Sequence, residues 1–149
     1  YSGLKEYLQP FWKHDDMILN LGCGNSRMAQ EMFEDGFERI ISIDFSANVV
    51  KIMNDKCRHK RDEFKYVKMD ARQLEFEEDT KFDCVIDKAT LDCIFCGEGS
   101  VNNVKKTLKE IYLHGPLMLH GLKVPLKIYL VLILQYQDHL LYLLLMTML

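Results

Sequence analysis

A glycine-rich turn and two acidic residues are the features of this 149-residue sequence with the clearest chemical potential. The turn, Gly22-Cys23-Gly24-Asn25-Ser26, follows the apolar run 17–21. Two glycines one residue apart let the backbone turn sharply and lie against a ligand with no Cβ in the way. A dinucleotide-binding turn would need a third glycine at position 27, where the sequence has Arg27. The pattern therefore disfavours NAD and favours a nucleoside ligand that lacks a pyrophosphate.

The two acidic residues follow later apolar runs at positions that suit such a ligand. Asp44 ends the run 39–44, where a carboxylate can accept hydrogen bonds from both hydroxyls of a ribose. Asp70 follows the run 64–69 and can receive an adenine amino group, while Ala71 leaves room for the ring. For both aspartates the alternative is a purely local role in a turn or loop, although Ser46 already offers the next helix a cap.

Apolar runs alternate with helical patterns along the first two thirds of the chain. The runs 17–21, 39–44, 64–69 and 82–87 predict buried strands, and residues 26–34, 46–59 and 101–113 predict helices, the first two capped by Ser26 and Ser46. This alternation predicts an α/β fold, a doubly wound, mainly parallel Rossmann-like sheet with helices on both faces. Ligands of such sheets bind at the carboxyl ends of the strands, where the glycine-rich turn and the aspartates are expected to meet.

Four segments in order carry a family resemblance: ILNLGCGNS (18–26), IDFS (43–46), MDAR (69–72) and FDCVIDKATLDCI (82–94). Together they resemble the class I S-adenosylmethionine-dependent methyltransferases, and most of all the methyltransferase-like branch that includes the eukaryotic elongation factor 1A lysine methyltransferases. The resemblance covers about residues 4–112. It implies S-adenosyl-L-methionine as cofactor and, as partner, a protein substrate with a target lysine, such as a translation factor. It also implies a seven-stranded fold, which this chain would contain only in part.

The resemblance further implies a set of site residues. The cofactor-binding residues would be Asn20, Gly22, Cys23, Gly24, Asn25, Asp44, Phe45, Asp70, Ala71 and Asp87. Many class I enzymes have an acidic residue where this chain has Asn20, which supplies no charge. Because a lysine must attack as the free amine, nearby carboxylates would orient its nitrogen, and Asp87 and Asp92 are the candidate catalytic residues. The alternative for Asp92 is a helix N-cap before Cys93.

Three other functions stay open at this point. A methyltransferase of a small molecule or RNA would be expected to carry a substrate-binding insertion rich in basic or aromatic residues, and none is evident. An inactive S-adenosylmethionine-binding fragment is compatible with the short chain. A nicotinamide oxidoreductase is disfavoured by Arg27.

Composition excludes several other classes of protein. With 48% hydrophobic and 28% charged residues, the chain is neither a disordered protein nor a multi-span membrane protein. A net charge of -3 argues against nucleic-acid binding by bulk electrostatics. The five cysteines are an odd number, which disfavours a disulfide framework and favours a reducing, cytoplasmic location. Cys93 and Cys96 form a single C-x-x-C motif, so we expect no metal site and instead packing beside Ile94 and Phe95.

The last part of the chain differs from the rest in composition. We divide the sequence into a methyltransferase core, 1–112, and an atypical Leu-rich segment, 113–149, whose charged residues are Lys123, Lys127 and Asp138. Residues 128–134 have the length and β-branched content of a fifth strand, predicted to lie beside the strand 82–87, and residues 140–148 would form a further strand or helix. The alternative is that this tail is foreign to the fold. Neither apolar stretch of this segment reaches the roughly 20 residues that span a bilayer. No signal peptide is evident, and without an initiator Met we expect the chain to start inside a longer protein.

Overall fold

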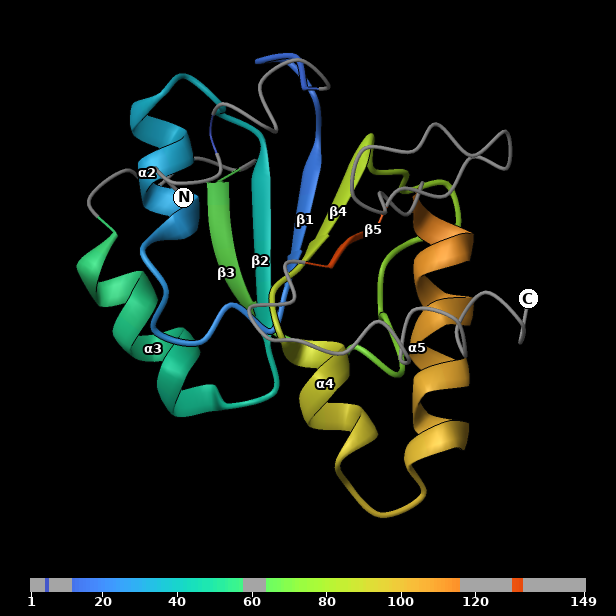
Figure 1. The fold of residues 1–149 in the computed structure, drawn as a ribbon. Coiled ribbons are helices and arrows are strands. Elements are labelled where there is room, and N and C mark those ends of the chain that lie inside the picture. The colour runs from blue at the N-terminus through green and yellow to red at the C-terminus, as the bar shows by residue number, and fades with distance from the viewer. Residues whose placement is uncertain (1–4, 6–11, 58–63, 116–129, 133–149) are drawn as a thin grey trace.

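The computed structural model describes residues 5, 12–57, 64–115 and 130–132, and every structural statement below concerns these residues (Figure 1). The strands are β1 (Ile18–Leu21), β2 (Ile40–Asp44), β3 (Phe64–Lys68), β4 (Cys84–Asp87) and β5 (Leu130–Leu132). The helices are α2 (Met28–Glu34), α3 (Ala47–Lys56), α4 (Thr90–Phe95) and α5 (Ser100–His114).

The five strands form one parallel sheet in the order β3-β2-β1-β4-β5. The chain runs outward from the central β1 to β3, then crosses back to place β4 on the other side of β1. This reversal of strand order is the topological switch point of a doubly wound sheet, as predicted. Strand β5 pairs with β4, with Leu130 opposite Val85 and Leu132 opposite Asp87. The predicted fifth strand is thus confirmed for residues 130–132; its other residues lie outside the described part of the chain.

Alternate residues of each strand face two separate cores. On one face, Met28 and Met32 of α2 and Met53 of α3 pack with strand residues such as Ile18 and Ile40. On the other face, Leu91 of α4 and Val104 and Ile111 of α5 pack with Leu19 and Val85. Figure 1 shows α2 and α3 on one side of the sheet and α5 on the other. Both faces of the sheet are therefore covered, which explains why β1 and β4 are buried at every position.

Serine side chains lie at the start of two helices, as predicted, but in different ways. The Ser46 hydroxyl accepts the N–H of Val49 at 3.3 Å and caps α3. Helix α2 begins at Met28, not at Ser26, because Ser26 is still held in the preceding turn by a hydrogen bond from its N–H to the Cys23 carbonyl. The Ser26 hydroxyl nevertheless accepts the N–H of Met28 at 3.2 Å. The predicted N-cap is thus one residue early, because Arg27 occupies that position.

Helix α4 was not predicted as a separate element, and it corrects two expectations. It begins at Thr90, so Asp92 lies in its first turn and is not its N-cap. Leu91 is its buried residue, whereas both Cys93 and Cys96 are exposed. The predicted packing of the two cysteines is therefore wrong, because a six-residue helix at the edge of the sheet turns most of its surface to solvent.

Candidate functional site

A cleft of about 400 Å³ lies at the carboxyl edge of the sheet. Each of the strands β1 to β4 contributes to its wall through the residues at or just after its end. The lining residues are Gly22, Ile43, Asp44, Phe45, Met69, Asp70, Ala71, Arg72, Lys88, Ala89, Thr90, Cys93 and Ile94. The cleft is thus at the switch point, where the order of strands predicted a ligand site.

Asp44, at the end of β2, joins three parts of this site. One carboxylate oxygen accepts the N–H of Gly24 at 2.8 Å, and the other accepts the N–H of Ser46 at 2.9 Å. A carboxylate oxygen can accept two hydrogen bonds, so each oxygen keeps acceptor capacity toward the cleft that Asp44 lines. This arrangement suits a pair of ligand hydroxyls, as a ribose would present.

The two glycines of the turn after β1 are needed for different reasons. Both Gly22 and Gly24 have φ +52°, a left-handed conformation that other residues rarely adopt. A Cβ added to Gly22 would overlap the Thr90 hydroxyl, so this glycine permits close packing against α4. A Cβ added to Gly24 would meet no atom within 4 Å, so this glycine faces open space.

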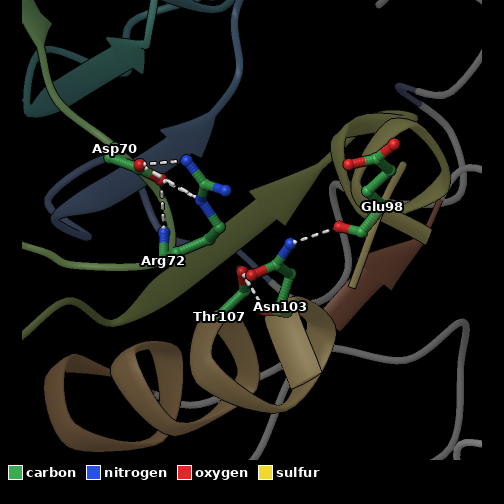
Figure 2. A network of polar contacts seen from close by, with 5 residues as sticks. All are labelled: Asp70, Arg72, Glu98, Asn103 and Thr107. Atoms are coloured by element: carbon green, nitrogen blue, oxygen red, sulfur yellow. Dashed lines mark hydrogen bonds and ion pairs between the residues drawn. The ribbon is translucent and has the colours of Figure 1, made fainter. Parts of the chain in front are cut away.

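Asp70 forms a close ion pair with Arg72 on the β3 side of the cleft. The Arg72 guanidinium donates to both carboxylate oxygens, with an Nη2–Oδ2 distance of 2.6 Å, and Figure 2 shows it turned back onto Asp70. The hydrogen bonds from Arg72 lower the pKa of the Asp70 carboxyl. Asp70 is therefore ionised and already paired, and its role toward an adenine amino group stays a prediction. Ala71, between them, is buried and lines the cleft as expected.

The two candidate catalytic carboxylates differ in environment, and neither lines the cleft. Asp87 is fully buried, and its Oδ1 accepts the N–H groups of Thr90 and Leu91 at 3.1 and 3.2 Å. Burial raises the pKa of the Asp87 carboxyl from 3.8 to about 7. Asp92 is half-buried, and desolvation raises its pKa as well. Their catalytic roles remain predictions, and the contacts of Asp87 are those of a group that holds the start of α4.

The remaining predicted cofactor-binding residues lie in the cleft, in the core and on the surface outside the cleft. Phe45 lines the cleft and is 69% exposed. Asn20 is buried, and its Nδ2 donates to the Ser42 hydroxyl at 3.2 Å. Cys23 is buried too, and burial raises the pKa of its thiol to about 12. Gly24 and the exposed Asn25 lie outside the cleft wall.

Several residues of the cleft wall were not among the predicted site residues. Lys88, Ala89, Thr90, Cys93 and Ile94 form its β4 side, and Ile43, Met69 and Arg72 complete it. The position of Lys88 and Thr90, directly after a predicted strand, is a signal that could have identified them. Cys93 and Ile94 could not be found in this way, because their place depends on the unpredicted helix α4.

A model of a family described as "Methyltransferase domain" matches residues 19–113, more than half of the chain and every residue that lines the cleft. The chain belongs to this methyltransferase domain family.

This methyltransferase domain is similar to two proteins whose names state that they methylate eEF1A. It is 35% identical over 113 residues to the eEF1A lysine and N-terminal methyltransferase of Mus musculus, an alignment that covers 74% of this chain and 16% of the relative. It is 38% identical over 119 residues to EEF1A lysine methyltransferase 4 of Bos taurus, covering 74% of this chain and 46% of the relative. The chain therefore spans less than half the length of either relative.

Solved structures show that the fold is shared with class I methyltransferases. The PH0226 protein of Pyrococcus horikoshii OT3 superposes with a TM-score of 0.57 at 25% identity, over 75% of this chain and 51% of that one. Magnesium protoporphyrin IX methyltransferase of Synechocystis PCC 6803, solved with bound S-adenosylmethionine, gives a TM-score of 0.58 at 16% identity, over 74% and 50%. Family and neighbours indicate S-adenosylmethionine as the cofactor, and the acceptor capacity of Asp44 and the open space at Gly24 fit it.

Membrane-spanning helices and clusters of metal ligands are both absent from the described residues. Among them, no helix is both long enough and apolar enough to cross a membrane. In the same part of the chain, no three His, Cys, Asp or Glu side chains are grouped so that they could hold a metal ion.

Proposed function

We propose that this domain transfers a methyl group from S-adenosylmethionine to a lysine side chain of a protein. The observation that carries the proposal is the cleft at the switch point, whose wall includes the partly free acceptor Asp44. The choice of lysine is supported by the relatives, whose names specify lysine methylation of eEF1A. A translation factor is accordingly the substrate class that we propose, in the cytoplasm.

Different residues of the cleft would contact different parts of the cofactor. Asp44 would accept hydrogen bonds from the ribose hydroxyls, and the exposed ring of Phe45 and the small Ala71 would flank the adenine. When bound, S-adenosylmethionine supplies an electrophilic methyl group on a sulfonium, so the protein has mainly to position donor and acceptor.

The lysine must reach the cleft as a neutral amine, although its reference pKa is about 10.4. We assign the orientation of its nitrogen to Asp92, which is half-buried on α4 and lies outside the cleft wall. Asp87 is fully buried beneath the start of α4 and would act by holding that helix in place.

Two measurements test this proposal in order. Calorimetric titration of the chain with S-adenosylhomocysteine should show binding, and titration with NAD should show none. Tritiated S-adenosylmethionine should then label a purified translation factor, and peptide mass spectrometry should locate the methyl group on lysine. Substrate whose lysines have been chemically dimethylated should remain unlabelled. Binding of NAD in place of S-adenosylhomocysteine would overturn the cofactor assignment, and a methyl group on any other residue type would overturn the choice of lysine.

A further inference from the structure

Thr90 connects the ends of two strands that are far apart in the sequence. Its hydroxyl donates to the Leu21 carbonyl at 3.0 Å, across 69 positions of the chain. Its N–H donates to Asp87 Oδ1 at 3.1 Å. Leu21 and Asp87 are the last pair of the ladder between β1 and β4, so Thr90 continues the connection between these strands just where their own pairing ends.

The same side chain determines how closely α4 approaches the glycine-rich turn. Gly22, the residue after β1, lies so near Thr90 that a Cβ there would overlap the Thr90 hydroxyl. Both residues line the cleft. The width of the cleft between the turn and α4 therefore depends on this contact.

The residue before Thr90 shows how firmly the connection is held. Ala89 has φ 70° and ψ 10°. In the described part of the chain it is the only residue other than glycine with a positive φ. A non-glycine residue keeps this conformation only where the surrounding contacts impose it. Here the contacts on either side are the carboxylate of Asp87 and the hydrogen bonds of Thr90.

We infer that Thr90 is a positioning residue for the cofactor. Its hydroxyl holds the turn after β1 against the start of α4, and so keeps Gly22, Cys23 and Gly24 in the arrangement that accepts S-adenosylmethionine. Because Leu21 is fully buried, loss of the hydroxyl would leave its carbonyl without this donor. The effect of Thr90 on cofactor binding rests on the proposed function. The ordering of the turn by Thr90 can be measured without any ligand.

Three variants of Thr90 separate its hydroxyl from its shape. Thr90→Val keeps the shape and removes the hydroxyl, Thr90→Ser keeps the hydroxyl, and Thr90→Ala provides a smaller side chain should the valine variant fold poorly. A matched control is Thr107→Val, since the buried Thr107 also donates its hydroxyl to a carbonyl, that of Asn103 at 3.0 Å, but on α5 and outside the cleft wall (Figure 2).

The first measurement is amide hydrogen exchange of the chain without ligand. The N–H groups of Cys23 and Gly24 are held by the Ile43 carbonyl and the Asp44 carboxylate. Thr90→Val should accelerate their exchange at least tenfold, Thr90→Ser should restore it, and Thr107→Val should leave it unchanged. Unchanged exchange in both Thr90→Val and Thr90→Ala would overturn the positioning role, whatever the cofactor affinity.

The second measurement is the Kd for S-adenosylhomocysteine. We expect Thr90→Val to raise it at least tenfold and Thr90→Ser to stay within threefold of the parent chain. Thr107→Val should leave this Kd unchanged. An equal rise in Kd for Thr107→Val would reduce Thr90 to a general structural residue. If the parent chain binds no S-adenosylhomocysteine while Thr90→Val still accelerates exchange, the proposed function fails and the ordering of the turn by Thr90 stands.

Discussion

The N–H of Gly24 donates to the carboxylate of Asp44 at 2.8 Å, which joins the turn after β1 to the end of β2 across 20 positions of the chain. The same carboxylate accepts the N–H of Ser46, at the start of α3. Asp44 therefore shapes the two loops on either side of it and still offers acceptor capacity to the cleft. A single side chain thus fixes the local geometry of both loops and lines the cleft.

Replacement of Asp44 should weaken cofactor binding. Asp44→Ala removes the acceptors for the ribose hydroxyls, and we expect a loss of about 1.5–3 kcal/mol in the binding free energy of S-adenosylhomocysteine, measured by calorimetry. Asp44→Asn keeps one acceptor oxygen and should lose less. The control is Asp55→Ala, on an exposed position of α3, which should bind as the parent chain does. An unchanged affinity of a folded Asp44→Ala variant would contradict the ribose role.

Substitution by alanine should destabilise the chain to a different extent at the two glycines of the turn. Gly24→Ala adds only the cost of a left-handed alanine, about 1–2 kcal/mol in the free energy of unfolding. Gly22→Ala adds the overlap with Thr90, and overpacking of this kind costs typically about 1–3 kcal/mol more. Urea unfolding of the two variants measures the difference. Equal destabilisation would show that Gly22 is not in close contact with Thr90.

A larger side chain at Gly24 tests the location of the ligand. A Cβ at this position meets open space, so Gly24→Val should still fold, with its stability lowered by the left-handed backbone, while its branched side chain blocks S-adenosylhomocysteine. Calorimetry should detect no binding, and circular dichroism should be unchanged. Normal binding by this variant would place the cofactor elsewhere.

The buried carboxyl of Asp87 should make stability depend on pH. Its pKa is about 7 in the folded chain and 3.8 as a reference, so between these values the folded chain holds a proton that the unfolded chain has released. The contribution of Asp87 to stability is therefore lost as the pH rises from about 4 to about 7, by at most about 4 kcal/mol. The amide of the Asp87→Asn variant does not titrate, so the variant does not share this loss. As the pH rises from about 4 to about 7, the free energy of unfolding of the variant should therefore increase relative to that of the parent chain.

Urea unfolding at pH 4.5 and pH 8 measures this effect in both proteins. The matched control is Asp79→Asn, because Asp79 is an exposed aspartate. Its stability should follow that of the parent chain at both pH values. Parallel pH profiles of Asp87→Asn and the parent chain would contradict a raised pKa at Asp87.

The cysteines should differ in reactivity according to their burial. Cys93 and Cys96 are exposed, whereas Cys23, Cys57 and Cys84 are buried. We expect an aromatic disulfide reagent to modify two thiols rapidly in the folded chain and all five only after unfolding. Because Cys93 lines the cleft and Cys96 does not, S-adenosylhomocysteine should protect Cys93 alone. Equal protection of both thiols, or of neither, would argue against the cofactor's contact with α4.

The local pattern of the sequence is sufficient to predict most of the strands and helices. The strands β1 to β4 and the helices α2, α3 and α5 coincide with predicted segments, with ends that shift by up to two residues where both are described. These predictions succeed because a buried strand requires a continuous apolar run and a surface helix an apolar stripe, whatever surrounds them. The Ser46 cap succeeds for the same reason, since its hydrogen bond spans only three positions.

The sequence also indicates where the site lies, since carboxyl ends of parallel strands meet at one edge of a sheet. Gly22, Asp44, Phe45, Asp70 and Ala71 were predicted from this rule and from the family resemblance, and all line the cleft. What the rule cannot supply is the direction of each side chain. Asn20, Cys23 and Asp87 belong to the same strand ends but are buried within the fold.

Only the tertiary structure decides contacts between residues that are distant in sequence. The different requirements for Gly22 and Gly24 follow from the approach of Thr90, whose partner Leu21 is 69 positions away. The exposure of Cys93 and Cys96 follows from the placement of α4, which depends on Asp87 beneath its first turn. Such contacts depend on how the packed sheet brings β1 and β4 together, and no periodicity within either segment contains that information.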